Sequence, residues 1–132
     1  MAAFASSRAG DSAQATRLSN DLAKRFPHNT LVRFNHLPAI RAVGESRNGD
    51  VANAIQTLAA ATPYEIGITA LTGGSTLYPA YMRGAAYLAA KPGPAAAAEF
   101  QKIRDHLGVV QDEILRRAGA TRAMQSVRFV GR

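Results

Sequence analysis

The sequence predicts an all-α protein built from antiparallel helix hairpins. Hydrophobic residues make up 47% of the chain, alanine is abundant and aromatic residues reach only 7%. Because alanine is the strongest helix former, this composition favours helices. Glycine and proline interrupt the chain at intervals, and the segments between them carry apolar residues at helical spacing. The β-leaning runs 66–71 and 127–130 are short, so we expect no sheet.

The first expected helix ends before Pro27, which cannot continue it. Asp11 or Ser12 can cap its start by accepting hydrogen bonds from unpaired backbone N–H groups. Ala15 and Leu18 lie on one face at helical spacing. A short apolar segment before this helix resembles the end of a preceding one, so we expect the first hairpin to begin there.

The second hairpin is expected to begin near Thr30, after which apolar residues recur every three positions. Pro38 lies inside this segment, so it must either kink the helix or mark its true first turn. Gly49 and Asp50 form the next turn, and the second helix of the pair then runs until Pro63.

The third hairpin follows the longest irregular stretch, residues 64–76. Ser75 or Thr76 can cap its first helix, which carries a proline in its first turn, where that residue is tolerated. Residues 91–94 form the next turn, and residues 95–106 form the last expected helix of the array.

Residue spacing within the third pair has a recognisable form. Gly84 and Tyr87 have the Gly-x2-Tyr spacing found in the first helix of tetratricopeptide repeats, and Ala96 and Phe100 have the Ala-x3-Phe spacing of the second. The physical reason is that small residues allow two helices to cross closely, while the rings fill the groove beside the crossing. The chain thus resembles a short solenoid of tetratricopeptide-like hairpins.

The resemblance extends over about residues 1–107, with Ala15 and Ala54 at the small positions of the first and second pairs. The chain departs from the family in two ways. Ala80 stands where the repeat has a tryptophan, and longer connections between the helices make each repeat longer than the standard unit of about 34 residues. Four short runs more narrowly resemble the helical repeats that follow the kinase domain in a group of bacterial serine/threonine protein kinases: Leu22–Pro27, Leu37–Ala42, Tyr78–Tyr81 and Ala98–Ile103. This implies a docking segment without kinase activity, since the kinase motifs are missing.

Residues 1–108 are therefore expected to form the repeat region, and residues 109–132 a short helix with a basic tail. The net charge is +7, and beyond Glu113 the chain carries no acid but five arginines: Arg116, Arg117, Arg122, Arg128 and Arg132. Such a tail is either a solvated chain end or a surface for nucleic acid or anionic membrane.

Protein–protein interaction is the preferred function, because the resemblance implies that the first helices of the repeats line a peptide groove. The candidate partner-binding residues on these helices are Arg33, Asn35, Arg41, Tyr78, Tyr81 and Arg83. Arginines can clamp a carboxylate of an acidic peptide, and tyrosines combine large area with a polar tip. The alternative for the tyrosines, including Tyr87, is packing in the core.

Enzymatic constellations are absent from the sequence. There is no cysteine, and the three histidines are widely separated, so neither a metal site nor a cofactor is expected. Residues 73–76 resemble a phosphate-binding loop but lack its lysine. No apolar run is long enough for a membrane span, and no ordinary signal peptide is visible, which favours a cytoplasmic protein. A short array with uncovered ends predicts self-association or a larger parent chain.

Overall fold

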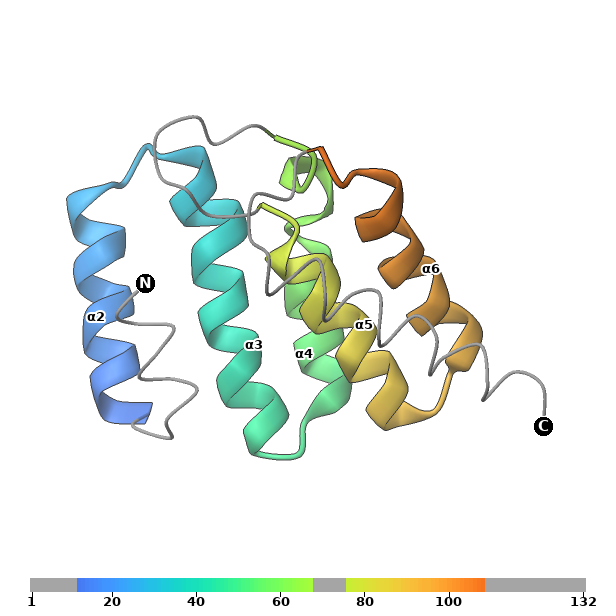
Figure 1. Ribbon diagram of the computed structural model, residues 1–132. Coiled ribbons are helices and arrows are strands. Elements are labelled where there is room, and N and C mark those ends of the chain that lie inside the picture. The colour runs from blue at the N-terminus through green and yellow to red at the C-terminus, as the bar shows by residue number, and fades with distance from the viewer. Residues whose placement is uncertain (1–11, 68–75, 109–132) are drawn as a thin grey trace. The chain divides into compact units, whose positions relative to one another are not determined.

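The computed structural model describes residues 12–67 and 76–108, and within these ranges the protein is all-helical with no strand (Figure 1). The chain divides into two compact units, residues 1–61 and residues 62–132. Each unit is considered by itself below. The expected repeat boundary at residue 108 and the short helix after it stay predictions, because residues 109–132 lie outside the described part of the chain.

Unit 1 contains α2 (Ser12–Arg25), α3 (Leu37–Arg47) and α4 (Val51–Ala59). A π-helical segment, η1 (Val32–His36), leads directly into α3. The α3 and α4 helices pack against each other as an antiparallel hairpin, and α2 packs along η1 and α3 (Figure 1). The helices expected within the described part of this unit are therefore present, with α2 ending two residues before Pro27. The preceding helix expected before Gly10 lies outside the described residues.

Pro38 explains the π-helical segment. Helical backbone runs without a break through residues 30–47, and α3 within it begins at Leu37, so Pro38 lies in the first turn of α3, which is one of its two expected positions. A proline cannot donate to the carbonyl four residues earlier, and its ring clashes with that carbonyl, here that of Phe34. Immediately before it, the Leu37 N–H donates to the Val32 carbonyl, five residues back. The wider turn accommodates the proline inside the helix.

The turn between α3 and α4 is determined by two residues. Gly49 has φ +82°, in the left-handed region that suits glycine. Asp50 is the N-cap of α4: its Oδ1 accepts from the Asn53 backbone N–H at 3.2 Å, and its Oδ2 accepts from the Asn53 side-chain amide at 2.6 Å. The cap satisfies a backbone donor that the first turn leaves unpaired. Past α4, Pro63 lies in the short 3₁₀ helix η2 (Thr62–Tyr64).

Unit 2 contains η2, α5 (Tyr78–Ala90) and α6 (Gly93–Asp105), and the last two pack as a second antiparallel hairpin (Figure 1). Lys91 closes α5 with φ 72°, a left-handed C-cap conformation. The core of the unit consists of five fully buried apolar residues: Leu77, Ala80, Ala96, Phe100 and Ile103.

The expected capping role of Thr76 is wrong. Leu77 is the N-cap of α5, with no side-chain capping bond. The buried Thr76 hydroxyl lies 2.6 Å from the Glu65 carbonyl oxygen and 2.9 Å from that of Gly67, so it donates back to the segment after η2. This hydroxyl thus joins the two ends of the 68–75 connection. Ser75, the other expected cap, lies outside the described residues.

The positions that the repeat pattern requires to be small are buried in each unit: Ala15, Ala54, Gly84 and Ala96. The closest approach is at Gly84, where an added Cβ would lie 2.8 Å from two ring atoms of Phe100. Tyr87 is half-buried and packs against the core of unit 2. The described chain thus contains two close-packed antiparallel hairpins, and their stacking into a solenoid stays a prediction.

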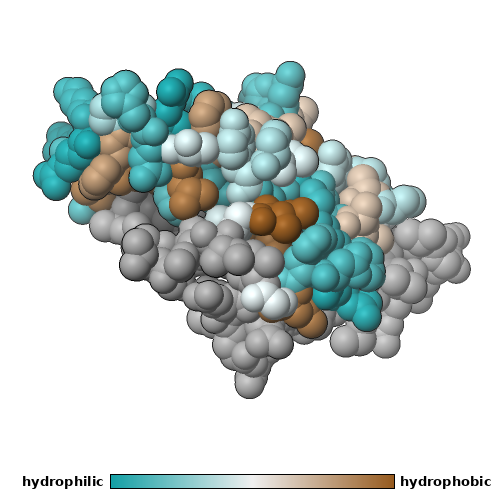
Figure 2. All heavy atoms as spheres, turned by 90° about the horizontal axis from the view of Figure 1, so that it is seen from above, coloured by the Kyte–Doolittle hydropathy of each residue, from teal (hydrophilic) through white to brown (hydrophobic). Residues whose placement is uncertain are grey.

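The surface of the described residues carries few large apolar side chains. Phe26, Ile66 and Leu107 are exposed, and on the face drawn in Figure 2 the hydrophobic residues occupy separate areas among hydrophilic ones. Among the described helices, none has the length and hydropathy to cross a bilayer.

Candidate functional site

A groove runs between α2 and α3 of unit 1, with a volume of about 460 Å³. Volumes of this order are typical of ligand sites. Eleven described residues line it, five from α2 and six from α3 or the turn after it: Ala15, Thr16, Ser19, Asn20, Ala23, Leu37, Ile40, Arg41, Gly44, Arg47 and Asn48. On both sides these residues recur at three- and four-residue spacing, so the groove follows the helix axes.

The residues that line the groove include two chemical groups, small residues and arginines. Small residues from α2 and Gly44 from α3 leave the space open, and a Cβ added at Gly44 would meet nothing within 4 Å. Arg41 and Arg47 are the charged residues among the described lining, and no carboxylate is among them. The groove lining therefore combines apolar side chains and the amides of Asn20 and Asn48 with positively charged side chains of α3.

Of the residues expected to bind a partner, Arg41 lies in this groove and is exposed. Arg33 is also exposed, but its guanidinium lies 5.3 Å from the centre of the Phe34 ring, in a cation–π contact along its own helix. Asn35 is only 1% exposed, so its amide is not available to a partner at the surface. The expectation for Asn35 does not fit its position, because it lies on the face of η1 that is turned to the interior.

The expected tyrosines lie in unit 2. Tyr78 and Tyr81 are half-buried and form an edge-to-face pair with ring centres 6.4 Å apart. The Tyr81 ring lies 6.1 Å from that of Phe100, in the core. Both rings thus pack against the core of the unit, which was the alternative to a role in binding.

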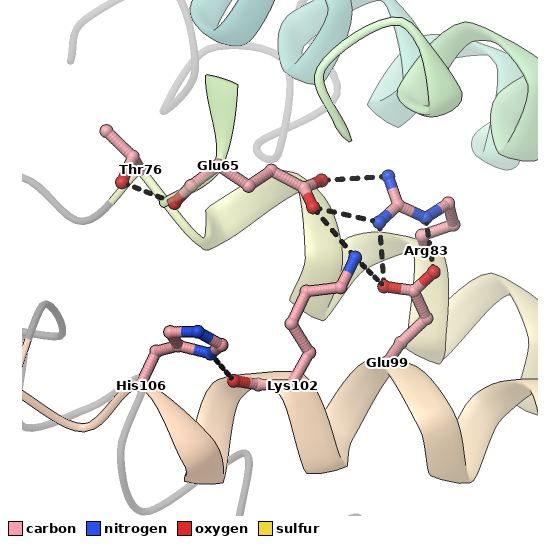
Figure 3. Close-up of polar contacts among 6 residues, drawn as sticks. All are labelled: Glu65, Thr76, Arg83, Glu99, Lys102 and His106. Carbon is pink, nitrogen blue, oxygen red and sulfur yellow. Dashed lines mark hydrogen bonds and ion pairs between the residues drawn. The ribbon is translucent and has the colours of Figure 1, made fainter. Parts of the chain in front are cut away.

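Arg83 differs most from its expected role. It is 3% exposed and its guanidinium is occupied by two carboxylates of the same unit (Figure 3). Nε and one terminal nitrogen donate to the two oxygens of Glu99, each at 2.7 Å. The terminal nitrogens also donate to the two oxygens of Glu65, at 2.8 and 3.1 Å. An arginine held in this way stabilises the interior and is not free to clamp a peptide.

Lys102 completes this buried ion cluster, which consists of Glu65, Arg83, Glu99 and Lys102. Its Nζ lies 3.0 Å from Glu65 Oε2 and 3.3 Å from Glu99 Oε2. As Figure 3 shows, the four side chains converge from the segment after η2, from α5 and from α6. Two positive and two negative charges balance, and burial of ions is tolerated when each is paired and hydrogen-bonded.

The cluster also determines the protonation of Arg83. Burial by itself lowers the pKa of an arginine, but the hydrogen bonds to Glu99 and Glu65 outweigh it and raise the pKa of Arg83 above its ordinary value. A group whose pKa is higher in the folded than in the unfolded protein stabilises the fold fully at any pH below its unfolded pKa. This stabilisation is lost only as the pH rises through the folded pKa. Arg83 therefore stays charged wherever the protein is ordinarily studied.

Sequence reasoning missed Glu65, Glu99 and Lys102 as partners of Arg83. The three-residue spacing of Glu99 and Lys102 on one helix was a visible signal for a charge pair. Glu65 gave none, because it follows a proline-containing turn and reaches Arg83 only through the tertiary fold.

Comparisons with protein-family models, curated proteins and solved structures found no match. The chemistry of the site therefore has to be judged from the geometry of the chain itself.

No group of three histidine or acidic side chains lies close enough together in the described residues to hold an ion. His106, the histidine nearest the ion cluster, has its Nδ1 2.8 Å from the Lys102 carbonyl oxygen (Figure 3). The arginines of the basic tail lie outside the described residues, as do residues 73–75 of the phosphate-loop-like segment.

Proposed function

We propose that this chain is a non-enzymatic interaction module that binds an acidic segment of a partner protein in the groove between α2 and α3. The observation that carries the proposal is the charge of the groove: the exposed Arg41 lies in its lining, and no carboxylate is among the described lining residues. Arginine recognises carboxylates through paired, charge-assisted hydrogen bonds.

The acids near the groove have other partners. Asp21 of α2 pairs with Arg25 at 2.9 Å on the exposed surface. Glu45 of α3 accepts a hydrogen bond from the Thr57 hydroxyl of α4 at 3.1 Å. Neither acid forms an ion pair with Arg41, so the Arg41 guanidinium remains available to an anionic ligand.

The tetratricopeptide-like character of the chain is part of the same proposal. It is supported by the close crossing of α5 and α6 at Gly84 and by the buried alanines at the equivalent positions of the other helices. In such an array the helix containing Arg41 is the first helix of its repeat. Arg83 and Asn35 are left out of the proposed binding surface because they are buried.

The test is selection of random peptides on the immobilised full-length protein, followed by affinity measurements on the selected sequences. We expect aspartate and glutamate to be enriched among them. Arg41→Glu is expected to weaken their binding at least about tenfold, about 1.4 kcal/mol. The matched control is Arg17→Glu, which reverses the same charge on an exposed α2 residue outside the groove lining and should leave affinity unchanged.

Two results would count against the proposal. One is a set of selected peptides with no acidic bias. The other is an equal loss of affinity in Arg41→Glu and Arg17→Glu, since this would show a response to net charge and not to the groove.

A further inference from the structure

We infer that the acidic segment held in the groove is the end of α6 of a second copy of this chain, with Asp105 opposite Arg41 and Leu107 beside Gly44. This inference rests on the proposed function and names the partner that the groove accepts. Three features of the described residues support it: an exposed cation in the groove, open space next to that cation, and an exposed acid beside an exposed leucine.

The groove offers an anion partner and an apolar space side by side. Arg41 is exposed, and within residues 12–67 and 76–108 no ion pair includes it. Arg41 and Gly44 both line the groove and are three residues apart on α3, so they are neighbours on one helix face. A Cβ added at Gly44 would meet no atom within 4 Å. An acidic side chain and a large apolar one can therefore enter the groove together.

An exposed apolar side chain beside an exposed acid is what such a groove requires of its occupant. The large apolar side chains exposed among the described residues are Phe26, Ile66 and Leu107. Glu65, the residue before Ile66, is buried in the ion cluster. Asp21, the acid nearest to Phe26 in sequence, pairs with Arg25 at 2.9 Å. Leu107 differs from both, because the acid two residues before it, Asp105, is exposed.

The position of Asp105 also favours a cation from another molecule. Asp105 is the last residue of α6, and its Oδ1 accepts from the Gln101 side-chain amide at 2.7 Å. No ion pair in the described part of the chain includes Asp105. The helix dipole is unfavourable for a carboxylate at this end of a helix. An arginine of a neighbouring molecule would offset that cost through charge-assisted hydrogen bonds.

Both halves of this contact lie on one chain, but on different surfaces. The groove belongs to unit 1 and the end of α6 to unit 2, so neither surface pairs with itself. Each copy would therefore receive one neighbour in its groove and present its α6 end to another, which is a head-to-tail contact. A contact anchored by one carboxylate and one leucine is small, so we expect weak association that grows with concentration.

The experiment is analytical ultracentrifugation of the full-length protein from micromolar to millimolar concentration. The weight-average mass of the wild type should rise with concentration. Arg41→Glu and Asp105→Arg should each weaken association at least about tenfold. An equimolar mixture of the two variants should associate again, because the glutamate in the groove of one variant meets the arginine at the α6 end of the other. The unchanged groove and the unchanged α6 end in the mixture also match.

Charge-matched controls and an uncharged variant complete the experiment. Arg17→Glu and Asp21→Arg make the same charge reversals at exposed positions outside the groove lining and the α6 end, and both should associate like the wild type. The Asp21 variant loses an exposed ion pair that contributes little to stability. Leu107→Ser leaves the charge unchanged and should weaken association at least about threefold, since it removes the apolar half of the contact.

The outcomes separate this inference from the proposed function. A mass that stays at the monomer value up to millimolar concentration overturns the inference, and selected acidic peptides that bind through Arg41 would then identify the partner as a different protein. Association that is lost in Arg41→Glu but kept in Asp105→Arg, or that the mixture does not restore, also overturns the inference alone. Association and peptide binding that are both unaffected by Arg41→Glu overturn the inference and the proposed function together.

Discussion

Gly84→Ala is expected to destabilise unit 2, although alanine is the better helix former. Gly84 lies inside α5 with ordinary helical backbone, so alanine by itself would stabilise the helix by about 0.5–1 kcal/mol. The new Cβ, however, would lie 2.8 Å from Cε1 and Cζ of Phe100 and 3.2 Å from its Cδ1. These distances are shorter than carbon contacts allow.

The magnitude follows from the burial of the ring. Phe100 is fully buried and its ring faces that of Tyr81, so it cannot swing into solvent to make room. Forcing extra carbon into a packed core costs about 1–3 kcal/mol. Subtracting the gain in helix propensity of about 0.5–1 kcal/mol leaves a net loss of up to about 2.5 kcal/mol.

The assay is urea denaturation followed by tyrosine fluorescence. The chain has no tryptophan, and its four tyrosines, at positions 64, 78, 81 and 87, all belong to unit 2. The signal therefore reports unfolding of this unit. Gly44→Ala is the matched control in unit 1, followed by far-UV circular dichroism: its Cβ would enter open space, so it should gain about 0.5–1 kcal/mol.

A second variant isolates the cause. Phe100→Leu removes the two ring atoms closest to the new Cβ, so in that background the cost of Gly84→Ala should fall by at least about 1 kcal/mol. The argument is refuted if Gly84→Ala stabilises unit 2 as much as Gly44→Ala stabilises unit 1. It is also refuted if the effects of Gly84→Ala and Phe100→Leu simply add.

Further predictions concern the ion cluster, the hydroxyl contact and the helix cap. Arg83→Leu leaves Glu65 buried without its main partner and should cost unit 2 about 3–5 kcal/mol by tyrosine-monitored urea denaturation; a loss below about 1 kcal/mol would contradict the cluster geometry. Thr76→Val removes the 2.6 Å hydrogen bond to the Glu65 carbonyl and should cost about 1–2 kcal/mol in the same assay, whereas an unchanged midpoint would show the bond to be dispensable. Asp50→Ala should lower the free energy of unfolding of unit 1 by about 1 kcal/mol in urea denaturation followed by far-UV circular dichroism. Asp50→Asn should lower it much less, because asparagine also caps helices.

The helices were predictable from the sequence because their signals are local. Helical spacing of apolar residues, the turn at Gly49 and Asp50, and Pro27 and Pro63 as stops need no tertiary information. Pro38 was harder to interpret, because its effect depends on whether the preceding turn can widen. The hydrogen bond from the Leu37 N–H to the Val32 carbonyl shows that this turn does widen.

The candidate site was predictable only in part, because burial of a polar residue depends on the fold. Arg41 and Arg83 look alike in sequence, each on a helix expected to be the first of its repeat and each with apolar neighbours. The difference between them comes from Glu65, which is distant in sequence from Arg83 and reaches it through a turn. The groove itself was missed, since it results from small residues on two helices that meet only after folding.

The central claim is that an acidic peptide binds between α2 and α3, and nuclear magnetic resonance of the isotope-labelled full-length protein tests it most directly. Titration with a selected acidic peptide should shift the amide signals of Ala15, Ala23 and Gly44, while that of Ala96 in the core of unit 2 stays in place. Shifts confined to residues 62–132, or none in the groove when the peptide is saturating, would contradict the account.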